Sequence, residues 1–204
     1  MPYRASVALD DWTGRRRNEL RVLEEAHRAV SQVTPGPGRP RQRGGDHLAQ
    51  AFILRLYSEF QAFARELHDI MASVLIRGLD VPSYSHPPLI AAATLGRGID
   101  RGNAGLRTIS GDFKRLGHGT MLADLAVVNA RQGRDQQRYE ALTRLRNALA
   151  HGNSNQLATL RREHVKPTLT YGRESLPALN RIARAMDQAV WNHAASRFPA
   201  LTPW

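Results

Sequence analysis

A short span in the second half of the chain combines a permanent cation with a titratable base. Arg146 is followed directly by Asn147, and His151 stands about 1.4 helical turns after Arg146. A neutral histidine can take the proton of an RNA 2′-hydroxyl, and an arginine can hold the charge that builds on the phosphorane. These groups suffice for cleavage of RNA by its own 2′-hydroxyl, without a metal ion or cofactor. The products would carry a cyclic phosphate and a 5′-hydroxyl.

The composition is compatible with a polyanionic partner such as RNA. The chain of 204 residues has 29 Lys+Arg against 18 Asp+Glu and a formal net charge of +11. Only Lys114 and Lys166 are lysines, and the planar fork of the remaining arginines suits bidentate phosphate contacts. A GC-rich genome can explain the arginine preference but not the net charge. The absence of cysteine excludes disulfides and thiolate chemistry.

A metal-dependent alternative starts from the adjacent residues His68 and Asp69. An HD-type phosphohydrolase would also need an earlier histidine and a later aspartate, for example His47 and Asp124. Both residues of the pair fall away from the main apolar stripe of their helix, so a solvated pair is the better interpretation. We therefore predict no metal site. The glycine motifs at 96–98 and 117–119 follow no strand and do not indicate phosphate loops.

Apolar residues recur at helical spacing along most of the chain, which predicts an all-α bundle of about five main helices with an N-terminal helical arm. The longest helix is expected from Asp46 to about Arg77. Another should run from about Asp135 to Ala150, with Gly152 in the position that commonly follows a helix. The last is expected over about 173–196.

Composition divides the chain into an N-terminal arm at 1–33, a linker at 34–45 and a helical domain at 46–204. The linker is rich in proline, glycine and arginine, which disfavour regular structure. Arg15-Arg16-Arg17 lie near a helix start, where positive charge is unfavourable, so they should face solvent or a ligand. The stretches 96–119 and 167–172 are expected to be loops, the first with one helical turn near Asp112-Phe113.

Arg146 should lie at the margin of its helix's apolar face, because Leu142 and Leu149 flank it by about one turn. A half-buried arginine needs an anionic partner, which can be a phosphate or a carboxylate such as Glu59 or Glu66. On an ideal helix Arg146 and His151 are about 140° apart, so they would not converge on one phosphate. Two copies meeting at a symmetry axis can bring them together, which predicts a homodimer.

The sequence Leu145-Arg146-Asn147-Ala148-Leu149-Ala150-His151-Gly152-Asn153 resembles the terminal motif of HEPN ribonucleases. The earlier run Tyr57-Ser58-Glu59-Phe60-Gln61-Ala62-Phe63-Ala64-Arg65-Glu66-Leu67-His68-Asp69 is similar to the long helix of the bacterial branch related to RiboL-PSP proteins. The resemblance spans roughly Asp46 to Phe198. It implies a dimeric helical bundle with Arg146 and His151 catalytic and Asn147 supporting, and frequent roles in toxin–antitoxin or antiphage systems.

One position departs from this pattern. HEPN toxins silenced by a nucleotidyltransferase carry a tyrosine two residues after the histidine, where this chain has Asn153. The resemblance therefore does not imply that modification here.

Three hypotheses follow. The first is a metal-independent endoribonuclease with Arg146 and His151 catalytic, Asn147 and Glu59 supporting, and an antitoxin or defence-system partner. The second is a catalytically silent HEPN module that binds RNA or nucleotides or mediates assembly. The third, a basic DNA-binding protein, lacks a convincing helix-turn-helix. The start Met1-Pro2-Tyr3-Arg4 has no apolar signal region and no stretch suggests a membrane span, so we expect a cytoplasmic protein.

Overall fold

A computed structural model describes residues 2–32, 43–102, 104–200 and 202–204, and within these ranges it is helical with no β-strand. The predicted all-α class is confirmed. The elements in chain order are α1 Val7–Thr13, α2 Arg15–Gln32, α3 Arg43–Arg77, η1 Ser83–Ser85, α4 His86–Thr94, η2 Gly98–Arg101, α5 Leu106–Arg115, α6 Met121–Val128, α7 Gln132–Ala150, α8 Ser154–Arg162 and α9 Leu169–Arg197.

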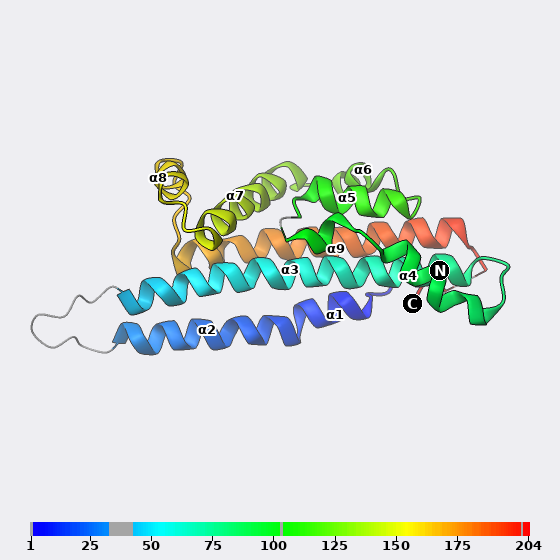
Figure 1. Cartoon of the computed structure of the whole chain (residues 1–204), viewed down its shortest axis with the longest axis horizontal. Coiled ribbons are helices and arrows are strands. Elements are labelled where there is room, and N and C mark those ends of the chain that lie inside the picture. Colours follow the sequence, from blue (N-terminus) through cyan, green and yellow to red (C-terminus); the bar gives the residue numbers. More distant parts are fainter. Residues whose placement is uncertain (1, 33–42, 103, 201) are drawn as a thin grey trace, which may run out of the picture.

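The bundle is organised around α3, which runs through its length between α2 and α9 (Figure 1). Its apolar residues recur every three or four positions and so form one stripe. Phe52, Phe60 and Phe63 of this stripe are fully buried. Helices α4, α5 and α6 gather toward one end of the bundle, and α7 and α8 lie toward the other (Figure 1).

The N-terminal helices belong to this bundle and do not extend from it as the expected arm. Trp12 of α1 is buried and packs edge-on against Phe60, with 5.6 Å between the ring centroids. Its indole N–H donates to Asn180 Oδ1 of α9 at 2.9 Å. Leu20 of α2 is buried in the same core. The arm was expected because a proline- and glycine-rich stretch follows it, but the apolar face of these helices is covered by α3 and α9.

Three expected boundaries also differ. Of the expected linker at 34–45, residues 34–42 lie outside the part of the chain that the structure describes, and residues 43–45 form the first turn of α3. The expected loop at 96–119 contains α5, whose Ile109 and Phe113 are buried despite Gly111. The expected loop at 167–172 ends early, because the Thr168 hydroxyl accepts the Tyr171 N–H at 3.2 Å and starts α9 there.

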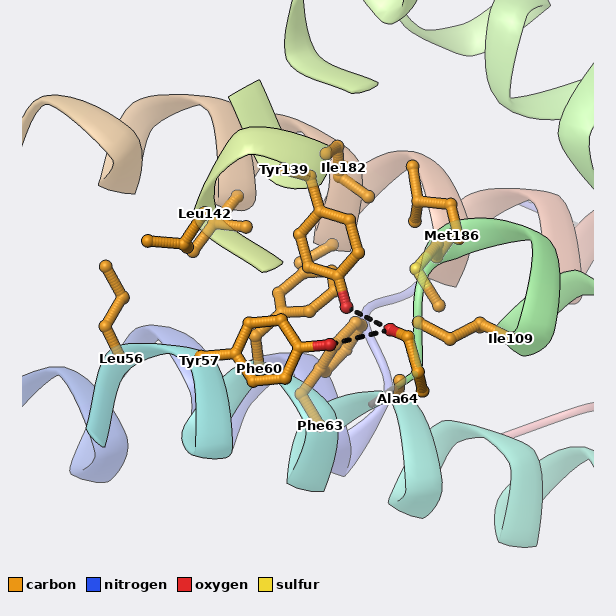
Figure 2. Close-up of a cluster of buried hydrophobic side chains, with 14 of the residues drawn as sticks. Leu56, Tyr57, Phe60, Phe63, Ala64, Ile109, Tyr139, Leu142, Ile182 and Met186 are labelled. Carbon is orange, nitrogen blue, oxygen red and sulfur yellow. Dashed lines mark hydrogen bonds between the residues drawn. The ribbon is translucent and has the colours of Figure 1, made fainter. Parts of the chain in front are cut away.

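Two buried tyrosines tie the segment between η2 and α5 to the core. Tyr57 of α3 and Tyr139 of α7 stack with their ring centroids 5.7 Å apart. Figure 2 shows both hydroxyls meeting one oxygen, the Ala104 carbonyl, to which they donate at 3.1 Å and 2.6 Å. Buried hydroxyls require such partners. Complete burial raises the pKa of Tyr139 well above its ordinary value, so its hydroxyl is a neutral donor.

Candidate active site

The end of α7 forms a tight turn with His151 at its outer edge. The Gly152 N–H donates to the Leu149 carbonyl at 3.3 Å, and the Asn153 N–H donates to the Ala148 carbonyl at 2.9 Å. This pair of bonds is a Schellman motif, which needs a left-handed residue after the cap. Gly152 supplies it with φ = 59°. The predicted role of this glycine is therefore confirmed, and the side chain of His151 is exposed.

Asn153 starts the next helix directly from this turn. Its side-chain oxygen accepts the Gln156 N–H at 3.0 Å and caps α8. Arg144 of α7 also reaches across to Glu163, just beyond α8, at 2.8 Å. Glu140, one turn before Arg144 on the same helix, accepts a hydrogen bond from Gln136 instead. The turn that carries His151 is thus held on both sides.

Arg146 lies half-buried where α7 crosses α3. Its guanidinium carbon is 5.5 Å from the centroid of the Tyr57 ring, within the range of a cation–π contact. Its Nη1 donates to Asn147 Oδ1 at 3.3 Å. Leu142 is buried one turn away, and Leu149 is partly buried. Arg146 is therefore at the margin of the apolar face, as its spacing predicted, and in contact with the residue expected to support it.

Glu59 is engaged elsewhere. One of its oxygens lies 2.5 Å from Arg16 Nη1 and the other 2.6 Å from Arg55 Nε. Glu66, the other candidate partner of Arg146, also pairs with Arg16. The proposed support of Arg146 by Glu59 is thus replaced by an ion cluster that joins α2 to α3.

Arg16 is the buried cation at the centre of this cluster. It is 5% exposed and lies between three carboxylates, Asp11 at 2.7 Å together with Glu59 and Glu66. The prediction that the whole run Arg15-Arg16-Arg17 faces solvent or a ligand was therefore wrong for Arg16. Arg15 does face solvent, with 57% of its side chain exposed.

The residues of the metal hypothesis form a different cluster. His68 is fully buried, which corrects its interpretation as solvated. Arg97 Nη1 lies 3.2 Å from its Nδ1, and the Asp112 carbonyl lies 3.3 Å from its Nε2. Asp69 pairs with the same Arg97. Burial, followed by the Arg97 charge, lowers the pKa of His68, so the ring is neutral at pH 7. No group of three potential metal ligands occurs among the described residues.

The structure therefore places Arg146 over Tyr57 and beside Asn147, and it places His151 on the exposed turn that follows. Tyr57 belongs to the run that resembles HEPN proteins, but its contact with Arg146 depends on how α7 crosses α3. A scan against family models and searches of curated proteins and of solved structures found no match. In the part of the chain that the structure describes, no helix is both long and apolar enough to cross a membrane.

Proposed function

We propose that this protein is a metal-independent endoribonuclease of the HEPN type that acts as a homodimer. One observation carries the proposal: the last turns of α7 hold a half-buried arginine in contact with Asn147 and end on an exposed histidine. The net charge of +11 supports a polyanionic substrate. A toxin or antiphage role follows from this activity, since uncontrolled cleavage of RNA stops cell growth.

The chemistry would proceed by attack of the substrate on itself. His151, as the neutral imidazole, accepts the proton of the 2′-hydroxyl while the 2′-oxygen bonds to the adjacent phosphorus. The bond from phosphorus to the 5′-oxygen then breaks, and this oxygen takes a proton from a protonated histidine or from water. Arg146 stabilises the extra negative charge on the phosphorane oxygens. The products are a 2′,3′-cyclic phosphate and a 5′-hydroxyl.

Two copies are needed because the two groups have different surroundings in one chain. Arg146 is packed over Tyr57, within the bundle, and His151 lies on the exposed turn after the helix. A twofold axis beside the end of α7 would place Arg146 of one copy near His151 of the other. Each dimer would then have two composite sites.

The second candidate is a silent HEPN module that binds RNA or nucleotides or mediates assembly. It is favoured by the contacts of Arg146 with Tyr57 and Asn147, which give this arginine a packing role without any catalysis. In that case the Arg–His pair is structural and its loss affects stability but no chemistry.

The test is cleavage of a labelled oligoribonucleotide and of total RNA in excess EDTA. Wild type should cleave and leave a cyclic phosphate, and Arg146→Ala and His151→Ala should each be slowed by about 100-fold or more. Arg161→Ala is the matched control on the neighbouring helix α8, because Arg161 is exposed. His164→Asn is the control for the histidine, because His164 has φ = 62°, a conformation that asparagine tolerates.

The outcomes separate the candidates. Cleavage that EDTA abolishes would contradict the metal-free mechanism. Binding of RNA without cleavage by any variant would favour the silent module. Equal loss of activity in the control variants would show that cleavage depends on the overall positive charge at this end of the molecule and not on the Arg–His pair.

A further inference from the structure

The outward face of α9 forms a basic strip with hollows along both sides. We call it the α9 strip and define it by the side chains Arg173, Pro177, Arg181, Arg184 and Gln188. Three hollows of about 390, 340 and 380 Å³ are lined by residues of this strip. Helices α1 and α2 lie along one side of it, and α6 and α7 pack along the other. The outward face of α9 therefore lies between hollows that separate it from these neighbouring helices.

The first hollow, between α2 and α9, is rich in hydrogen-bond donors. It is lined by Arg17 and Arg173, and the buried Nη1 of Arg17 has no hydrogen-bond partner. Asn180 also lines this hollow, and its side-chain oxygen accepts the Trp12 indole N–H. A buried donor without a partner is costly, and an anion bound there would satisfy it.

The other two hollows continue this basic character along α9. Arg184 is exposed and lines both, and Arg131 lines one of them. Arg181 is held by Asp135 through two contacts at 2.6 Å and 2.8 Å. Among the described residues, Arg17, Arg131 and Arg184 form no ion pair. The carboxylates that line these hollows are Asp10 and Glu174, against the five arginines Arg17, Arg131, Arg173, Arg181 and Arg184.

An aromatic ring lies beside the same strip. Tyr3 is 39% exposed and lines the second hollow together with Arg184. Its hydroxyl donates to Asp187 at 2.8 Å, and its ring packs edge-on against Trp191 at 6.1 Å between centroids. A ring held in this way is a rigid platform on which a nucleic-acid base can stack.

We propose that the α9 strip binds one strand of RNA through its phosphates, with Tyr3 stacking on a base. This inference rests on the proposed function for the identity of the nucleic acid. From Arg173 to Gln188 the strip is about 22 Å long at 1.5 Å per residue. Stacking on Tyr3 requires an unstacked base, which a single strand offers and a regular duplex does not.

The strip also leads toward the candidate active site. Near its start, Tyr171 of α9 lies under Arg138 of α7, with 4.7 Å between the guanidinium carbon and the ring centroid. The beginning of α9 and the end of α7 lie at the same end of the bundle (Figure 1). A strand bound along α9 would thus extend toward the turn that carries His151.

The experiment measures binding of a fluorescein-labelled 2′-O-methyl oligoribonucleotide by anisotropy over a range of KCl concentrations. This probe has no 2′-hydroxyl and is not cleaved, so binding is measured apart from catalysis. The test variant combines Arg17→Gln, Arg131→Gln and Arg184→Gln. A control variant removes the same charge elsewhere, at residues that are exposed and line none of the three hollows: Arg28→Gln, Arg107→Gln and Lys114→Gln. Circular dichroism verifies the helix content of both.

The test variant should bind at least about tenfold more weakly than the control variant in moderate salt. The slope of log K against log [KCl] should be smaller in magnitude by about 2 for the test variant. Each of the three lost phosphate contacts on a single strand contributes about 0.7 to this slope. Equal binding by the two variants would overturn the inference even if wild type cleaves RNA. Stronger competition by duplex DNA than by single-stranded RNA would also overturn it. Selective loss of binding would support the strip even if no cleavage is found, and only the proposed function would then fail.

Discussion

Mixing two inactive variants tests whether the site is shared between two copies. Arg146→Ala keeps His151, and His151→Ala keeps Arg146. In each chain Arg146 is packed over Tyr57, 5.5 Å from the ring centroid, and His151 lies on the exposed turn beyond the helix. If a site takes its arginine from one copy and its histidine from the other, a mixed dimer has one complete site and one site that lacks both groups.

The expected magnitude follows from this arrangement. Random exchange of equal amounts of the two variants makes about half of the dimers mixed, and each of these has one working site of two. The mixture should therefore cleave at about one quarter of the wild-type rate at equal total protein. Either variant alone should be slower than wild type by about 100-fold or more. The mixture should therefore cleave about 25-fold faster than either variant alone, a difference that is large enough to measure without ambiguity.

The assay uses two differently tagged variants that are co-expressed and then separated by sequential affinity steps into mixed and unmixed dimers. Cleavage is followed in EDTA with a labelled oligoribonucleotide, and the purified mixed dimer, with one working site of two, should cleave at about half of the wild-type rate. If a site used both groups of one chain, no copy in a mixed dimer would be complete and activity would not return. An inactive, purified mixed dimer would therefore refute the shared site. A monomer in solution that cleaves RNA would refute it as well.

Two further predictions concern the groups that stabilise the fold. Arg16→Ala should lower the free energy of unfolding by about 3 kcal/mol in urea denaturation, because it leaves the buried Glu59 beside one arginine in place of two. Arg15→Ala, at an exposed ion pair, should change it little, and equal losses would contradict this account. Burial lowers the pKa of His68 in the folded protein, so the unfolded state binds more protons and stability should fall as the pH drops below about 6.5. His68→Gln should flatten this dependence by at most about 1.4 kcal/mol per pH unit, and an unchanged slope would contradict the assignment.

Local patterns in the sequence were sufficient for the helical class and for the ends of several helices. The stripe of α3 repeats every three or four residues over many turns, and only a helix places such residues on one face. Gly152 could be assigned to the end of α7 because a left-handed residue is needed there and glycine adopts that conformation without strain. Both features depend on neighbours in the chain, so they can be predicted without knowing the fold.

Tertiary structure decided which faces meet and therefore which charges are buried. Arg15, Arg16 and Arg17 are chemically identical, and only the packing of α2 on α3 places Arg16 between Glu59 and Glu66. The same applies to His68, which is buried because η2 and α5 cover α3 at that point.

In the candidate site, too, some features depend on the sequence alone and others on the tertiary structure. The spacing of Arg146 and His151 predicts that they cannot converge within one helix, whereas the contact of Arg146 with Tyr57 and the exposure of His151 depend on the crossing of α7 over α3. The basic strip on α9 joins arginines from α2, α9 and the start of α7, which are far apart in the sequence. Helical periodicity specifies the direction of each side chain about its own axis, but a surface shared by several helices exists only after they have packed.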